Sequence, residues 1–399
     1  MALTLTVDQL AEVAAALSTE IEKGLRRDGA RVQCLPTYIP PPQTGVQGRA
    51  TVIELGGSNL RSAVVSIDRG AAVFVDGPLE GKMPWSRGSA FSKDHLIRIQ
   101  ARQLAALKDD PGGPLGYCFS FPAVSRPDRD ARLLHWTKGL DVPGTVGTAV
   151  GRSLAVPAAE AAGRRYGRLS VLNDTVAALF AGLTEPGRQG KGSIGLILGT
   201  GTNMAAVFDT RAVTKLGPTP YAGKSIPVNL ESGNFTPPHL TRWDAVVDRR
   251  SENRGCQRFE KAVSGLYLGR LFKAVHPDSA FDARSGARGL MHLLENPASV
   301  SAGQLATAAQ ILDRSAGLVA GALAGLIESL RRQQPLREID ILAEGRLFWS
   351  TTEAGIDYSR RVHTLLTALL TQMGMPDVAI RFPHCRRPTL VGTAVAALS

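Results

Sequence analysis

The sequence predicts an α/β protein with two lobes and a cleft between them. Two similar units carry this prediction, each a β-rich run, a glycine turn ending in asparagine, and a second β-rich run, at residues 50–67 and 194–208. A third observation is a short apolar strand at 170–172 that leads through a polar junction into a helical run at 176–183. One such unit in each half of the chain indicates two lobes of related fold, and the cleft between them is the default ligand site.

Length and composition indicate a folded protein of two or three domains. The chain has 399 residues, of which 44% are hydrophobic and 20% charged. The longest uncharged apolar run, 316–327, is shorter than the roughly 18 to 20 residues of a membrane span and predicts a buried helix. Residues 6–9 have the pattern of a capping box at a helix start. We expect neither secretion nor membrane insertion.

Cysteine usage and charge narrow the class of partner. The four cysteines are widely spaced with no Cys-x-x-Cys pair, so we expect no disulfide framework or zinc site and place the protein in the cytoplasm. The net charge is +11, but the arginine pairs are spread along the whole chain. This favours a solvated basic surface over a nucleic-acid site, with some attraction for anionic substrates.

Two glycine turns, at 56–59 and 199–203, can hold phosphate groups. Glycines let the backbone approach a phosphate closely, and N–H groups with Ser or Thr hydroxyls supply neutral donors. Neither turn is a Walker loop, and neither has the Gly-x-Gly-x-x-Gly pattern of dinucleotide sites. One such turn alone would be interpreted as an ordinary glycine hairpin, whereas two turns in matched contexts favour a nucleotide-binding site.

The junction at 173–175 places Asp174 at the carboxyl edge of a sheet, where α/β folds carry their chemistry. The residues alone leave a second interpretation open, in which Asn173 or Asp174 is only a helix cap. Residues 116–122 predict a strand ended by proline, and 133–139 a strand ended by glycine, which puts Thr137 and Lys138 on a loop.

Two further carboxylates lie downstream. Glu231 lies within a small-residue turn at 228–233, and Glu260 lies in a run at 257–269 that predicts one helix. The apolar stripe of that helix is formed by Phe259, Val263, Leu266 and Tyr267. Glu260 and Lys261 fall off the stripe, so helical periodicity alone favours a solvated face for both.

Taken together, these motifs resemble those of the hexokinase family, which includes the glucokinases, within the actin-like ATPase (ribonuclease H-like) superfold. The matching segments, in the family's order, are 35–39, 54–61, 119–122, 136–139, 173–175, 199–203, 229–231, 259–261 and 314 onward. The resemblance implies mixed sheets flanked by helices around a central cleft. It also implies a small lobe of 48–173 plus 388–399 and a large lobe of 1–47 plus 174–387.

The resemblance implies transfer of the γ-phosphoryl group of ATP to the 6-hydroxyl of glucose or a related hexose. In the family's pattern Asp174 is the general base, and Lys138 supplies positive charge to the transferring group. The implied sugar-binding residues are Ser120, Thr137, Lys138, Asn173, Asp174, Asn203, Glu231 and Glu260. The implied ATP-binding residues are Glu54, Gly56, Gly57, Ser58, Asn59, Arg61, Gly199, Thr200, Gly201, Thr202, Glu344 and Gly345. Mg²⁺ is expected to be bound with ATP through phosphates and water, with no direct protein ligand and Glu54 at most through water.

The chain departs from the family's pattern at several positions. Glu54 stands where the family has aspartate, and Glu344-Gly345 stands for Asp-Gly in the adenosine motif. Residues 387–392 replace a glycine-rich segment, and Arg270 replaces a glutamate. Two alternatives therefore stay open: a sugar kinase that uses another phosphoryl donor such as polyphosphate, and a catalytically inactive sugar sensor. The sequence predicts neither the preferred hexose nor the oligomeric state.

Overall fold

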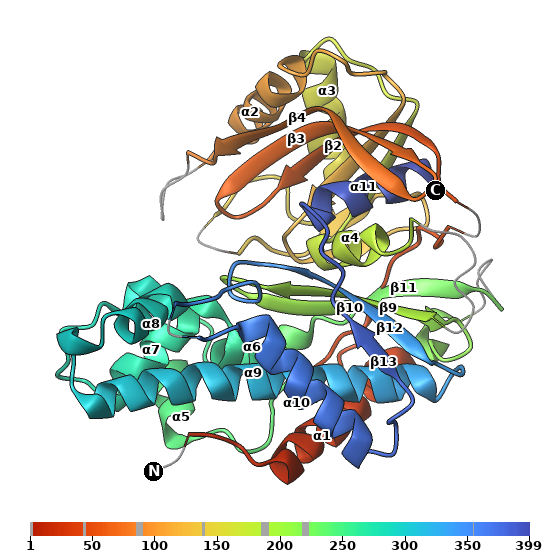
Figure 1. Cartoon of the computed structure of the whole chain (residues 1–399). Helices are drawn as coiled ribbons and strands as arrows, with labels where there is room; N and C mark the ends of the chain where they lie inside the picture. The colour runs from red at the N-terminus through yellow and green to blue at the C-terminus, as the bar shows by residue number, and fades with distance from the viewer. Residues whose placement is uncertain are drawn as a thin grey trace.

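Two mixed β-sheets form the framework of the computed structural model, which describes residues 3–42, 45–84, 91–137, 140–184, 191–217, 223–353 and 355–399 (Figure 1). The five-stranded sheet has the order β4 (Ala71–Lys82), β3 (Asn59–Asp68), β2 (Gly48–Leu55), β5 (Pro114–Phe119) and β8 (Arg168–Leu172). The six-stranded sheet has the order β1 (Leu35–Pro36), β11 (Ser225–Asn229), β10 (Thr202–Asp209), β9 (Lys191–Leu198), β12 (Glu338–Glu344) and β13 (Ala379–Arg381). We call the parts built on them the small lobe and the large lobe. The predicted fold class is confirmed, while the predicted lobe boundaries stay a prediction.

Both predicted strand–turn–strand units are present. β2 pairs with β3 antiparallel in the small lobe, and β9 pairs with β10 antiparallel in the large lobe. The last six residues of β2 are all buried, as expected of an apolar strand covered on both faces. Each glycine turn therefore lies at the end of a central strand of its sheet.

Parallel pairing brings the predicted site residues to common edges. β2, β5 and β8 run parallel, so the chain leaves all three at one edge of the small-lobe sheet. β9 and β12 are likewise parallel, with Ile197 opposite Glu344, so the second glycine turn lies beside the Glu344-Gly345 pair. Sites in α/β proteins lie at such carboxyl edges.

Helices cover both sheets. α1 (Val7–Arg26) begins with the predicted capping box, in which Thr6 and Gln9 cap each other. α1 packs on α9 (Ala302–Arg331) and α10 (Tyr358–Gln372) below the six-stranded sheet (Figure 1). α2 (Lys93–Ala105), a π-helical turn (Gly151–Ala155) and α3 (Val156–Ala161) cover the outer face of the five-stranded sheet. α5 (Arg242–Arg249), α6 (Arg258–Val263), α7 (Gly265–Val275) and α8 (Gly286–Glu295) complete the large lobe.

α9 contains the apolar run predicted to be a buried helix. With 30 residues it is long and apolar enough to cross a membrane by length and composition, but 89% of its most apolar window is buried inside the protein. Leu318, Leu323 and Ile327 are fully buried in the large-lobe core. Core packing therefore accounts for its composition.

Two helices lie between the sheets. α4 (Asp174–Ala181) and α11 (Pro388–Leu398) pack on each other, and α4 also contacts β9 of the large lobe (Figure 1). A separate apolar core forms there, with Val176, Phe180 and Leu390 fully buried. The base of the cleft is therefore a packed helical layer.

Two predicted elements are wrong in extent. The strand expected at 133–139 is only β7 (Ala131–Leu133), paired with β6 (Ala123–Ser125). Leu133 and Trp136 both pack into the small-lobe core. Side chains three residues apart point to opposite faces of a strand, so a continuous strand could not bury both on one side. The helix expected at 257–269 is broken into α6 and α7 at Ser264, which is extended with ψ 150°.

The break at Ser264 has a long-range cause. The backbone N–H of Gly265 donates to the carbonyl of Gly199 at 2.7 Å, and a Cβ on Gly265 would come within 2.8 Å of that oxygen. The start of α7 is therefore fixed against the second glycine turn, a contact that helical periodicity does not reveal.

Candidate functional site

The β8–α4 junction presents Asp174 at the carboxyl edge of the small-lobe sheet. Asn173 is the N-cap of α4, because its side chain accepts a hydrogen bond from the backbone N–H of Thr175 at 2.9 Å. Asp174 is the first helical residue, and its Oδ1 accepts from the same N–H at 2.8 Å and from the Thr175 hydroxyl at 3.2 Å. A helix N-terminus favours negative charge there. The cap interpretation is thus right for Asn173, and it leaves Asp174 oriented and half-buried.

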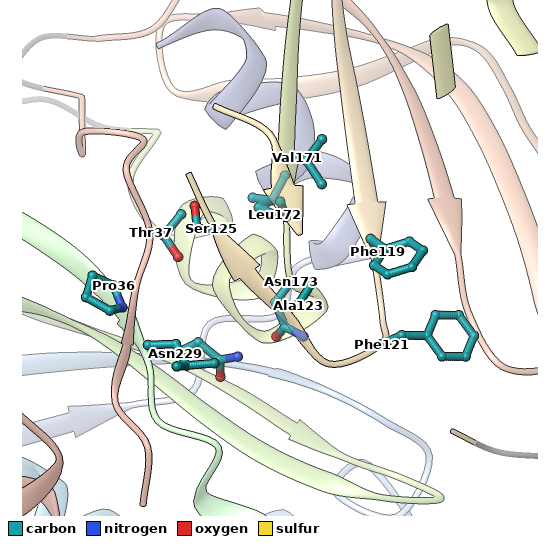
Figure 2. A pocket seen from close by; sticks show the side chains of 12 residues that line it. Pro36, Thr37, Phe119, Phe121, Ala123, Ser125, Val171, Leu172, Asn173 and Asn229 are labelled. Carbon is teal, nitrogen blue, oxygen red and sulfur yellow. The ribbon is translucent and has the colours of Figure 1, made fainter. Parts of the chain in front are cut away.

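A small cavity shows that the two lobes face each other at this junction. It has a volume of about 20 Å³ and is lined by Asn173 of the small lobe, Asn229 of the large lobe and Thr37 of the segment after β1. Figure 2 shows Asn173 and Asn229 as neighbouring side chains at this cavity. Ser120, which follows β5, is held at the same edge by its backbone N–H, which donates to Leu55 at 3.1 Å.

The large lobe contributes a chain of amides that ends at Glu231. The Nδ2 of Asn203 donates to Asn229 Oδ1 at 2.7 Å, and the Nδ2 of Asn229 donates to Glu231 Oε1 at 2.8 Å. The Oδ1 of Asn203 accepts from the backbone N–H of Ser232 at 3.1 Å. Glu231 has a left-handed backbone (φ 54°), a strained conformation of the kind found at functional sites. Asn229 was not predicted as a site residue; its place in the same short motif as Glu231 was the available signal.

Glu260 faces the site and not solvent. Its Oε2 accepts from the backbone N–H of Thr202 at 3.1 Å. A Cβ on Gly201 would come within 2.6 Å of that oxygen, so a larger residue there would displace the Glu260 carboxylate. The solvated-face interpretation is also wrong for Lys261, whose side chain is 3% exposed and pairs with Asp248. Arg270, which the sequence left unexplained, places its guanidinium 4.9 Å from the ring centre of Tyr267.

The two glycine turns are closed by their own backbones. Gly56 donates to the carbonyl of Asn59 at 3.0 Å, and Gly199 donates to that of Gly201 at 3.0 Å. Gly345 has φ 132°, and a Cβ there would come within 2.1 Å of the Leu198 carbonyl. The Glu344-Gly345 pair thus packs directly on the second turn. Ser58 and Thr200 are exposed at the tips, and Gly57 and Thr202 complete the turns.

The two unusual glutamates lie together. Arg61 Nη1 donates to both carboxylate oxygens of Glu54 at 3.2 Å and lies 3.6 Å from Glu344. The hydroxyl of Thr389 donates to Glu54 at 3.2 Å, and its backbone N–H donates to Glu344 at 3.0 Å. This cluster joins β2 and β3 of the small lobe, β12 of the large lobe and the start of α11. The sequence did not predict the role of Thr389.

Burial raises the pKa of Glu54 to about 7, with Arg61 opposing the rise and the charges of Glu344 and Asp174 adding to it. Within the described parts of the chain, no three His, Cys, Asp or Glu side chains are arranged to hold a metal ion by themselves. Mg²⁺ commonly binds through one or two carboxylates, water and substrate phosphates. The excess of carboxylates around Glu54 fits an ion of that kind.

One predicted catalytic residue falls outside the described residues: Lys138, together with Gly139. Thr137 precedes them on the loop after β7, and its carbonyl accepts from the backbone N–H of Leu140 at 3.2 Å. The other predicted residues lie at the two sheet edges or beside them, except that Glu260 reaches the second glycine turn from α6.

Comparisons with known proteins show which family this chain resembles. Two models described as hexokinase match residues 1–183 and 193–310. Hexokinase-2 of Solanum tuberosum is 28% identical, over 98% of this chain and 88% of the relative. Hexokinase-1 of Saccharomyces cerevisiae is 31% identical, over 68% of this chain and 58% of the relative. A solved hexokinase of Schistosoma mansoni, complexed with glucose, has a TM-score of 0.78 and 21% identity, over 99% of this chain and 96% of that one, a likeness of fold.

Proposed function

Because the chain belongs to the hexokinase family, which implies the use of ATP, we propose that it transfers the γ-phosphoryl group of ATP to the 6-hydroxyl of D-glucose or a related hexose. The observation that carries the proposal is the position of Asp174. It lies at the edge of the small-lobe sheet, next to Asn173, which lines one cavity with Asn229 of the large lobe, and its charge acts on Glu54 beside the first glycine turn. A carboxylate at this position can contact a hydroxyl of a bound sugar while it lies close to the groups that bind the nucleotide.

Asp174 is the general base of the proposed mechanism. A sugar hydroxyl is a weak nucleophile, and it must lose its proton as it attacks the γ-phosphorus. The two hydrogen bonds from Thr175 hold one oxygen of the carboxylate in place. A positioned general base contributes about 10² to 10⁴ in rate. Lys138 would place positive charge on the transferring phosphoryl group.

The sugar is bound by polar groups from both lobes. Asn173, Ser120 and Thr137 contribute from the small lobe, and Asn203, Glu231 and Glu260 from the large lobe. The large-lobe groups are held by Asn229 and by the backbone of Thr202, so their acceptors are fixed before the sugar arrives. A hexose is covered with hydroxyls, and ionised acceptors give the stronger hydrogen bonds to them. Since both lobes contribute, binding of the hexose favours a closed cleft that excludes water.

The nucleotide side comprises the two glycine turns, Arg61 and the Glu344-Gly345 pair. Turn N–H groups bind phosphate oxygens, and Arg61 adds a guanidinium suited to phosphate. Mg²⁺, held mainly by phosphates and water with Glu54 and Asp174 as nearby carboxylates, would neutralise charge on the phosphates. Arg61 lies against the carboxyl groups of Glu54 and Glu344, so a bound phosphate would compete with them for the guanidinium.

A matrix of substrates tests the proposal. Glucose, mannose and fructose would each be assayed with ATP, ADP and polyphosphate in the presence of Mg²⁺, and glucose binding would be measured separately by calorimetry. We expect hexose 6-phosphate to form with ATP as the preferred donor. Faster transfer from polyphosphate than from ATP would show that ATP is not the preferred phosphoryl donor. Glucose binding without transfer from any donor would support the inactive sensor.

A further inference from the structure

The helix that carries Glu260 cannot hold its own position. α6 has only six residues, and helices this short are unstable in isolation. It begins at Gln257, which has a left-handed backbone and makes no side-chain cap, and it ends at the extended Ser264. Yet Glu260 has little free space around it, because a Cβ on Gly201 would come within 2.6 Å of its Oε2 and one on Gly233 within 3.4 Å of its Cβ. A contact from outside α6 therefore has to fix it.

Asp248, on α5, makes one such contact, in addition to the hydrogen bond from the Phe259 N–H to the Phe235 carbonyl and the one from the Ser315 hydroxyl to the Val263 carbonyl. Its Oδ1 accepts from Lys261 Nζ at 2.7 Å, and its Oδ2 lies 3.5 Å from Arg258 Nη1. The backbone N–H of Gly255, in the loop between the helices, donates to it at 3.1 Å. Asp248 and Lys261 are 8% and 3% exposed. One buried carboxylate thus binds α6 at two positions and the loop that precedes it.

We propose that Asp248 is a positioning residue for hexose binding, which holds Glu260 against Thr202 by anchoring Lys261; this inference rests on the proposed function. Lys261 and Glu260 are neighbours in α6, with Lys261 directed to α5 and Glu260 to the second glycine turn. Because the helix is so short, the position of Lys261 on one side fixes the orientation of Glu260 on the other. Asp248 also neutralises the buried ammonium group of Lys261.

Asp244 provides a matched control. It lies one turn earlier on α5, is 5% exposed, and pairs with Arg314 of α9 at 2.9 Å. Its other hydrogen bonds are made with Thr241, so among the described residues its hydrogen-bond partners lie on α9 and at the start of α5 and not in α6. Replacement of Asp244 removes a buried ion pair from the same helix, so it reproduces the loss of stability without loosening α6.

The test is a double-mutant cycle on glucose affinity. Glucose dissociation constants would be measured by calorimetry for the parent, Asp248→Asn, Glu260→Gln and the double variant, with kcat and both KM values recorded alongside. We expect Asp248→Asn to weaken glucose binding about tenfold, as for the loss of one hydrogen bond to a charged group, with the KM for ATP within about twofold. The double variant should bind little worse than Glu260→Gln alone, since Asp248 acts through Glu260.

The controls separate positioning from stability. Asp244→Asn should lower the Tm while leaving glucose affinity near that of the parent. If Asp248→Asn does not fold, Lys261→Met cuts the same link and leaves Asp248 paired with Arg258. Unchanged glucose affinity in the folded variants, or effects of Asp248 and Glu260 that multiply independently, would overturn the inference. Failure of the parent protein to bind any hexose would instead overturn the proposed function.

Discussion

Glu54 should make the protein less stable as the pH rises. Its pKa is about 7 in the folded protein against an ordinary 4.5, because burial, Glu344 and Asp174 outweigh Arg61. Between these two values the folded state keeps a proton that the unfolded chain has released. The contribution of Glu54 to stability is therefore most favourable below pH 4.5, falls as the pH rises through this window, and reaches its full penalty above pH 7. Glu54→Gln cannot ionise and escapes the penalty.

The size of the effect follows from the shift. One pKa unit corresponds to about 1.4 kcal/mol, so a rise from 4.5 to about 7 amounts to roughly 3 kcal/mol in the free energy of unfolding. The amide oxygen of glutamine still accepts from Arg61, which also keeps its contacts with Glu80 and Glu344. Glu54→Gln should thus be more stable than the parent at pH 8 by up to about 3 kcal/mol, and nearly equal to it at pH 5.

Urea unfolding followed by tryptophan fluorescence at pH 5, 6, 7 and 8, without nucleotide, measures this difference. Glu80→Gln is the matched control, because the charge of Arg61 and the hydrogen bonds from Arg61 and Arg387 hold the pKa of Glu80 below its ordinary value of 4.5 despite its slight burial. Glu80 stabilises the fold above its unfolded pKa of 4.5 and loses that effect only at lower pH, so the difference between Glu80→Gln and the parent should stay nearly constant from pH 5 to 8. A difference between Glu54→Gln and the parent that stays constant from pH 5 to 8 would refute the reasoning.

Three further predictions concern the reaction. Asp174→Ala should lower kcat by about 10² or more while calorimetry still detects glucose binding, and retention of a tenth of the activity would contradict its role as base. Glu260→Gln should raise the hexose KM about tenfold and leave the ATP KM nearly unchanged, since an amide oxygen can still accept from Thr202; the opposite pattern in steady-state kinetics would place it on the nucleotide side. Glu54→Asp should narrow the difference in kcat between Mg²⁺ and Mn²⁺, because Mg²⁺ tolerates a displaced ligand less well. Glu54→Ala should lower kcat with both ions. Full activity of the alanine variant would show that Glu54 has no part in positioning the metal.

The parts of the fold that depend on neighbouring residues were predictable. The two glycine turns, the capping box at Thr6 and the buried helix around 316–327 all follow from local patterns, and all are present. The placement of Asp174 also follows, because a strand followed by a capped helix fixes its position at the sheet edge. Local chemistry was enough for these features.

Features that depend on contacts between distant segments were not predictable in this way. The break at Ser264 is set by Gly265 meeting Gly199, and the burial of Lys261 is set by Asp248 on another helix. Helical periodicity predicts that a polar side chain off the apolar stripe is solvated. It does not reveal a buried partner that comes from a distant segment. The identification of Glu231 and Glu260 as site residues therefore came from the family resemblance and not from their spacing.

The two glutamates that replace aspartates show how such distant contacts give meaning to substitutions that look unrelated. Glu54 and Glu344 lie far apart in the sequence, yet both bind Thr389 and both approach Arg61. Thr389 is the second residue of α11, whose N-cap, Arg387, provides no side-chain cap. Glu344 supplies the missing acceptor and a negative charge at the helix N-terminus, where both are stabilising. The longer side chains thus let a strand of each lobe bind one end of the helix that packs between them, so the two substitutions form one structural unit beside the first glycine turn.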